Sequence, residues 1–135
     1  MKRLAQIFID ELKSKELTVD YKEDSDGDVI VQIPFDGKMT TFIFNGDEGE
    51  YVSMYTCFES IPAEKVPTML VVCNQLNMTY KWLKFYIDRD NDLMVQDDAI
   101  LTEENAVSEC IELLLRRGRI LKEAKPIIMR PLYGI

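Results

Sequence analysis

Hydrophobic residues recur at helical spacing within residues 61–77, near the middle of the chain. The members of this stripe lie three or four residues apart and share one helix face: Val66, Met69, Leu70, Cys73 and Leu76. Strand-like segments flank the stripe, so we expect this face to cover a sheet. Pro62 suits a first helical turn, whereas Pro67 would kink a helix interior. We therefore expect the regular helix to begin near Pro67, after a loose turn.

Apolar alternation and turn signals predict one helix and four strands before this central helix. Residues 4–12 show helical spacing, with Asp10 and Glu11 on the polar side. The Asp-Gly pairs at residues 26–27 and 36–37 are strong hairpin signals between apolar runs. The expected strands are residues 17–22, 29–34, 39–45 and 51–58.

The second half of the chain predicts a further hairpin and a last helix. Strands are expected at residues 80–87 and 93–100, and the helix should open at Thr102 and end near Gly118. Pro126 and Pro131 predict an extended tail over about residues 125–135. The element order is α-β-β-β-β-α-β-β-α. We therefore expect a single α+β domain over residues 1–135, with a mainly antiparallel sheet and helices packed on one face.

The chain lacks the residues on which most enzyme mechanisms depend. It contains no histidine, the commonest general base, and no glycine-rich nucleotide-binding motif. We expect no enzymatic activity, no catalytic residue and no cofactor. The net charge of −8 repels phosphate backbones, so nucleic-acid binding is disfavoured as well.

Membrane insertion and disulfide bonds are also not expected. No apolar run approaches the ~18 residues of a membrane span, and Asp10 and Glu11 interrupt the N-terminal apolar stretch. The cysteines, Cys57, Cys73 and Cys110, are odd in number and widely spaced. We expect free thiols in a cytoplasmic protein that does not bind membranes.

Two acidic loops share part of a calcium-binding pattern. The aspartates at residues 88–92 match the first, third and fifth positions of an EF-hand loop. Leu93 stands where that loop needs glycine, and Ala99 stands where it needs glutamate. The loop at residues 24–28 fails in the same way. We therefore expect two solvated hairpin tips and no metal site.

The sheet is expected to carry aromatic residues on the face that the helices leave open. If residues 80–87 form one strand, Leu83, Phe85 and Ile87 point one way, and three aromatic side chains point the other. Together with two tyrosines of an earlier strand, the expected interaction face is Tyr80, Trp82, Tyr86, Tyr51 and Tyr55. Such a face is either an interface or is covered within the monomer. We expect a homodimer through it, with a polypeptide partner as the alternative.

One combination of motifs resembles a known family. It begins with Ile61-Pro62 and Glu64-Lys65, continues through Asn74-x-x-Asn77 and an acidic hairpin at residues 83–92, and ends with Thr102-Glu103-Glu104. This pattern resembles the YbjN-domain proteins, which are described as bacterial sensory transduction regulators. The resemblance implies a fold similar to that of type III secretion chaperones, and it implies no catalytic residues.

These observations favour a non-enzymatic interaction or regulatory module that binds a polypeptide or itself. The alternative is a domain that senses a small ligand in a pocket between helix and sheet. Asn74 and Asn77 lie near the end of the central helix, where their amides could bond free carbonyls or the next strand. A ligand-binding role for these two residues is the alternative.

Overall fold

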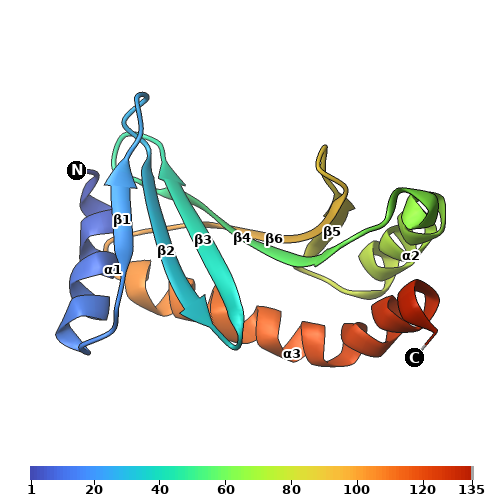
Figure 1. Ribbon diagram of the computed structural model, residues 1–135. Helices are drawn as coiled ribbons and strands as arrows, with labels where there is room; N and C mark the ends of the chain where they lie inside the picture. The colour runs from blue at the N-terminus through green and yellow to red at the C-terminus, as the bar shows by residue number, and fades with distance from the viewer. Residues whose placement is uncertain (135) are drawn as a thin grey trace.

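The computed structural model describes residues 1–134 and contains a six-stranded antiparallel sheet with three α-helices (Figure 1). The strand order is β1-β2-β3-β4-β6-β5. The elements are α1 (Arg3–Ser14), β1 (Asp20–Glu23), β2 (Val29–Phe35), β3 (Lys38–Asn45), β4 (Tyr51–Ser60), the 3-10 turn η1 (Ala63–Lys65), α2 (Val66–Thr79), β5 (Lys84–Ile87), β6 (Asp92–Ile100) and α3 (Ala106–Tyr133). This confirms the predicted α+β class and element order.

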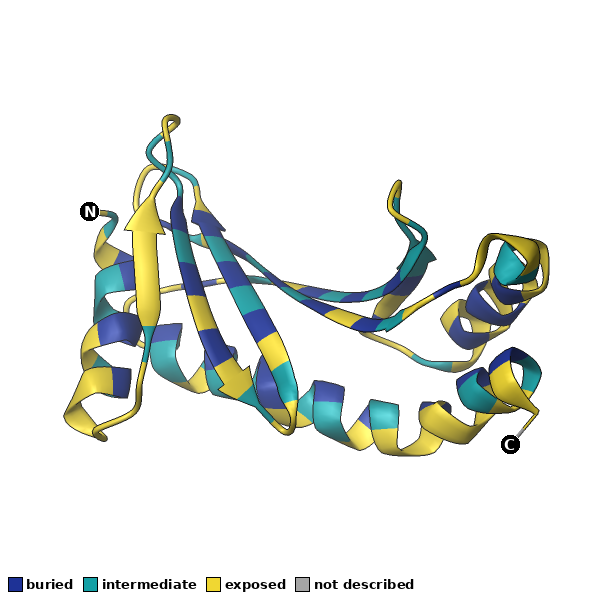
Figure 2. Ribbon diagram, viewed as in Figure 1, coloured by how far each residue is buried: buried dark blue, intermediate teal, exposed yellow. Residues whose placement is uncertain are grey.

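The helices pack on one face of the sheet, which we call the inner face. Along β3, Phe42 and Phe44 are fully buried on this face, whereas Ile43 between them is partly exposed on the opposite, outer face. Strands β2, β4 and β6 alternate in the same way. The burial pattern in Figure 2 follows this alternation, because side chains of period two point to opposite faces of a sheet. Among residues 1–134, no helix covers the outer face.

The core consists of two apolar clusters, and α3 contributes to both. The first joins α1 and strands β2–β4 to the early turns of α3, ending at Leu114. The second joins α2, β5 and β6 to the late turns of α3. In this second cluster, α3 presents one residue in every four: Ile120, Ala124, Ile128 and Leu132. The single long helix therefore packs against both halves of the sheet and fixes their relative position.

The prediction of an extended tail was wrong for residues 125–133, which are helical. The helix passes Gly118 and contains both Pro126 and Pro131. A proline inside a helix removes one backbone hydrogen bond. Here the stripe from Ile120 to Leu132 stays buried only if the helix continues, so packing overrides the local signal. Figure 1 shows this end of α3 turning toward α2.

The central helix begins where the sequence predicted. After η1, α2 starts at Val66 and carries Pro67 in its first turn. The predicted buried face, however, was wrong at Leu70, which is 52% exposed, while Val72 is buried instead. Nearly every side of α2 is apolar, so its spacing alone could not select the side that packs on β5 and α3.

The strand expected at residues 80–87 is shorter than predicted. β5 begins at Lys84, and Trp82 just before it adopts a left-handed backbone conformation with φ of +85°. Because this residue is not extended, strand alternation does not reach back to Tyr80. β1 is also shorter than predicted and begins at Asp20.

The corrected face of α2 predicts opposite outcomes for two neighbouring substitutions. Met69 is fully buried in the second cluster, so Met69→Ala should lower the free energy of unfolding by about 2–5 kcal/mol. Leu70→Ala removes a similar volume from an exposed position and should cost less than about 1 kcal/mol. Urea unfolding of both variants tests this, and a larger loss for Leu70→Ala would mean that the helix packs through its other side.

Candidate functional site

The outer sheet face brings together three of the predicted aromatic residues. Tyr51 and Tyr55 lie on β4 and Tyr86 lies on β5, at positions whose side chains point away from the helices. Tyr51 is 52% exposed, and the other two are partly buried. Tyr55 stands beside Gln96 of β6, and the Tyr86 hydroxyl donates a hydrogen bond to Gln96 Oε1 at 3.0 Å. Tyr55 and Tyr86 therefore both lie next to Gln96 of the intervening strand β6, whereas Tyr51 lies further along β4, opposite Ile100.

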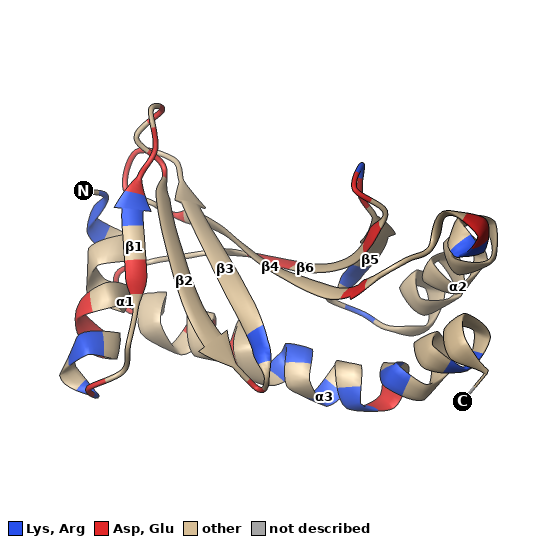
Figure 3. Ribbon diagram, viewed as in Figure 1, with Lys and Arg blue, Asp and Glu red and all other residues tan. Residues whose placement is uncertain are grey.

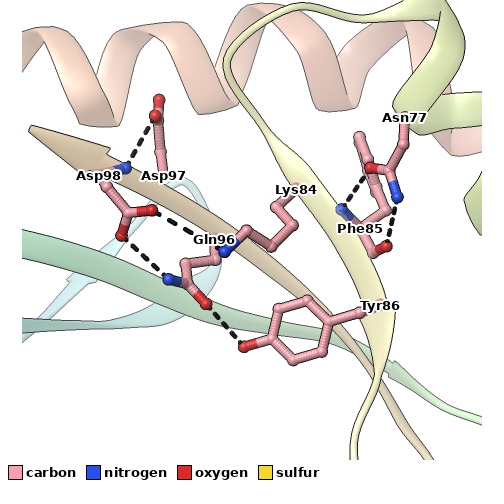
Figure 4. Close-up of polar contacts among 7 residues, drawn as sticks. All are labelled: Asn77, Lys84, Phe85, Tyr86, Gln96, Asp97 and Asp98. Carbon is pink, nitrogen blue, oxygen red and sulfur yellow. Dashed lines mark hydrogen bonds and ion pairs between the residues drawn. The ribbon is translucent and has the colours of Figure 1, made fainter.

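A series of polar contacts continues from Tyr86 and Gln96 to neighbouring side chains. Gln96 Nε2 donates to Asp98 Oδ1 at 2.9 Å, and Lys84 Nζ lies 4.0 Å from Asp98 Oδ2 (Figure 4). Burial, aided by the nearby Tyr55, Asp88 and Asp98, raises the pKa of Tyr86. The phenol is therefore a neutral hydrogen-bond donor at physiological pH.

Two exposed apolar side chains lie on the same face as the tyrosines. Met39 of β3 and Ile100 of β6 are 56% and 70% exposed. Ile100 lies directly opposite Tyr51 in the β4–β6 register. Aromatic and methionine side chains at an exposed surface are typical of protein interfaces, because each offers a large apolar area.

Tyr80 and Trp82 do not belong to this face, and their placement there was wrong. The Trp82 ring lies 4.6 Å from Cζ of Arg116, which comes from α3 on the inner side of the sheet. Tyr80 packs against the second apolar cluster, with its ring centroid 6.5 Å from that of Phe85. Both residues precede β5. The alternation of side chains along a strand, on which their expected place on the outer face was based, therefore does not apply to them.

A buried polar layer lies between the two apolar clusters. The sequence analysis did not predict it. Arg117 of α3 is 1% exposed and donates from Nη1 to the hydroxyls of Thr40 and Thr56, the latter at 2.6 Å. Its Nη2 donates to the carbonyl oxygen of Phe35 at 2.8 Å. The spacing Leu113, Arg117, Ile120 could have placed Arg117 on the buried face. The expected end of the helix near Gly118 instead places Arg117 in its last turn.

The adjacent Arg116 of α3 adds an ion pair to this polar layer. Its Nε lies 2.8 Å from Oδ2 of Asp97, a β6 residue that is 2% exposed. Figure 4 shows Asp97 and Asp98 on opposite sides of the strand. Burial raises the pKa of Asp97, and the pairing with Arg116 opposes that shift.

The cysteines offer no reactive thiolate. Cys73 and Cys110 are buried, and loss of water raises the pKa of the Cys73 thiol to about 11. Burial raises the pKa of Cys110 as well. Cys57 is exposed, but partial burial and the nearby Asp92 and Asp88 raise its pKa. Since the thiolate is the nucleophilic form, all three are poor nucleophiles at neutral pH.

Comparison with protein families identifies the group to which this sequence belongs. The family model "YbjN: Putative bacterial sensory transduction regulator" matches residues 6–122 of the 135 residues. The chain belongs to the YbjN family. No curated protein sequence matches it. Among residues 1–134, no helix is both long and apolar enough to cross a membrane.

Solved structures share the fold of this YbjN-family chain at low sequence identity. The crystal structure of YbjN, "a putative transcription regulator from E. coli", is 14% identical over 90% of both chains, with a TM-score of 0.62. The ExsC–ExsE complex is 16% identical over 100% of both chains, with a TM-score of 0.60. The Yersinia pestis type III secretion chaperone SycH, in complex with a stable fragment of YscM2, is 8% identical, with a TM-score of 0.54. That match covers 86% of this chain and 97% of the other. The expected likeness to type III secretion chaperones is confirmed.

Asn77 of the YbjN-family motif has a structural role. Its amide pairs with the backbone of Phe85 like a neighbouring strand, donating to the carbonyl oxygen at 2.9 Å and accepting from the N–H at 2.8 Å (Figure 4). The amide therefore caps part of the sheet edge formed by β5. Of the two structural roles that the sequence left open for this amide, free carbonyls or the next strand, Asn77 takes the bond to the next strand. Asn74 is exposed and makes only a 3.7 Å contact with the Met78 sulfur.

These contacts predict that the two asparagines differ in their effect on stability. Asn77→Ala leaves a partly buried strand edge without two hydrogen bonds and should cost about 1–3 kcal/mol of unfolding free energy. Asn74→Ala, the matched control, should change it by less than about 0.5 kcal/mol. Denaturant unfolding measures both, and equal losses would contradict the edge-capping role.

The two acidic loops are alike in structure, and hydrogen bonding explains their aspartates. Oδ1 of Asp24 accepts from the N–H groups of Asp26 and Asp28, and Oδ1 of Asp88 accepts from those of the aspartates at residues 90 and 92. Gly27 and Asn91 take the left-handed position at equivalent points, with φ of +84° and +61°. The first aspartate thus stabilises a tight turn.

We expect no calcium binding tighter than roughly millimolar at either loop. The carboxylates of residues 88–92 do lie within 4.8 Å of one another. The loop lacks the bidentate glutamate, however, and Asp88 already accepts two backbone hydrogen bonds. Isothermal titration calorimetry on the wild type and on Asp90→Asn measures the affinity. Micromolar binding that disappears in the variant would overturn this prediction.

Proposed function

We propose that this YbjN-family protein is a non-enzymatic regulatory module that binds a polypeptide through its outer sheet face. One observation carries the proposal: this face has no helix over it within residues 1–134, yet it presents Tyr51, Tyr55 and Tyr86 among exposed apolar side chains. The proposed setting is the bacterial cytoplasm, where thiols stay reduced.

The structural neighbours support a polypeptide as the ligand. ExsC is seen in complex with ExsE, and SycH with a fragment of YscM2. The chemistry of the face agrees with this choice. Its tyrosines combine apolar area with hydroxyl groups, and Gln96 and Asp98 add hydrogen-bonding side chains beside them. Such a surface can bind apolar side chains and hydrogen-bond the groups next to them.

We propose as a second property that the protein forms a homodimer. The dimer surface is on α2 and does not include Trp82. Three large apolar side chains of this helix are exposed: Leu70 at 52%, Val71 at 58% and Met78 at 79%. Val71 and Met78 lie on the side opposite the buried residues of α2, and Leu70 lies at the flank between the two sides. A patch of this kind can serve both subunits of a symmetric dimer.

Photo-crosslinking tests both surfaces in one design. A benzophenone amino acid replaces Tyr55 on the outer face, Val71 on α2, or, as a control, the exposed Lys15 directly after α1. In living cells, position 55 should give an adduct with a different polypeptide. Position 71 should give an adduct of two identical chains, and position 15 should give neither.

Second-site substitutions provide the controls for these adducts. Tyr51→Asp with Tyr86→Asp should abolish the adduct at position 55 and preserve the one at position 71. Val71→Glu should give a monomer in light scattering, whereas Trp82→Asp should leave assembly unchanged. An adduct at position 55 no stronger than at position 15 would reject the outer face. A wild-type monomer at high micromolar concentration would reject the dimer.

A further inference from the structure

A cavity of about 340 Å³ opens between α3 and the sheet, at the turn from β2 to β3. Asp36 and Lys38 line it from this turn, and Phe58 lines it from the end of β4. Arg117, Lys122 and Lys125 of α3 form the opposite wall, together with Leu121. The cavity is on the helix side of the sheet and is separate from the outer face.

Arg117 reaches this cavity as a buried cation without an ion-pair partner, although the charge of the cavity's one carboxylate, Asp36, opposes the lowering of the Arg117 pKa by burial. Its hydrogen bonds go to two hydroxyls and one carbonyl, which are neutral groups. They use three of the five N–H groups of a guanidinium. Within residues 1–134, no carboxylate lies within ion-pair distance of Arg117. Burial of a cation is costly unless a counter-charge compensates it, so this wall of the cavity favours an anion.

The remaining cations reinforce the positive charge of the cavity. Lys38 is held at the rim, because its Nζ donates to the Phe58 carbonyl oxygen at 2.9 Å and lies 4.7 Å from the Phe58 ring centroid. Lys122 and Lys125 are exposed on successive turns of α3. Four cations and the single Asp36 therefore line the cavity, a formal charge of +3.

This charge contrasts with the rest of the molecule. Residues 116–130 contain six Lys and Arg residues and one Glu, a net +5. The whole chain carries −8, so all other residues together carry −13. Figure 3 shows the basic positions of α3 lying next to the start of β3. A basic cavity in an acidic protein concentrates anions at one place.

We propose that this cavity binds a small organic phosphate, with the phosphate groups on Arg117, Lys122 and Lys125 and the organic part against Phe58 and Leu121. Guanidinium and ammonium groups together suit a phosphate that carries more than one negative charge. The cavity volume is at the small end of ligand sites, which fits a metabolite rather than a folded partner. Occupation would give the buried guanidinium its counter-charge. Because the ligand would contact both α3 and Phe58 at the end of β4, it would also stabilise the arrangement of helix and sheet.

Inorganic pyrophosphate is the probe for the first test. Calorimetry and thermal unfolding are measured at constant ionic strength, with the double variant Lys122→Gln/Lys125→Gln as the pocket variant. The control is Lys15→Gln/Lys81→Gln, which removes two exposed lysines outside the cavity. Wild type and control should bind pyrophosphate and show a rise in melting temperature that depends on its concentration. The pocket variant should bind it about tenfold more weakly.

Two further comparisons separate specific binding from general salt effects. Sulfate at the same ionic strength should give a smaller shift than pyrophosphate in the wild type, because it cannot place two phosphate groups on the cations. Arg117→Lys keeps the charge but loses the forked geometry, and it should weaken pyrophosphate binding if the variant still folds. No binding by the wild type, or equal binding by pocket and control variants, would overturn the proposal.

Discussion

The hydrogen bonds of Arg117 determine how the long helix sits on the sheet. One guanidinium connects α3 to β2, β3 and β4 through a carbonyl and two hydroxyls. Both threonines are buried, with Thr40 at 0% and Thr56 at 1% exposure. If the helix rotated or slid, a buried cation and two buried hydroxyls would lose their partners, and each loss costs free energy. Apolar contacts alone tolerate such shifts far better, so the polar layer specifies the arrangement that the two apolar clusters stabilise.

This arrangement explains why one side of the sheet remains open. A single helix, α3, spans both apolar clusters, with α1 and α2 beside it on the same side. The three helices satisfy the burial needs of the inner face only. The outer face must therefore balance solubility against contact with a partner. It combines tyrosines with apolar residues, and the hydroxyl of one tyrosine, Tyr86, is hydrogen-bonded to Gln96.

The sequence was informative where one local signal agreed with the tertiary structure. Element order and the start of α2 beside Pro67 were predicted correctly, and the bond from Asn77 to the next strand is one of the two structural roles left open for it. It failed where tertiary packing decided between local alternatives. Leu70 and Val72 are equally apolar, and only the position of β5 and α3 determines which is buried. The prolines of α3 predicted the end of the helix, but burial of the apolar stripe keeps this segment helical. The left-handed backbone of Trp82 interrupts the alternation that was expected before β5. Arg117 was missed because a charged residue in an apolar stripe looks like a surface residue until its partners are known.

The unequal distribution of charge has a kinetic consequence. Basic residues collect along α3, whereas the hairpin tips at residues 24–28 and 88–92 are acidic and point away from that helix (Figure 3). The molecule is therefore an electric dipole as well as a net anion. A charged molecule approaching within about 10 Å at moderate salt experiences a torque as well as an attraction or repulsion. Anions should approach on the α3 side and cations near the hairpin tips, so each encounter begins with the protein already oriented.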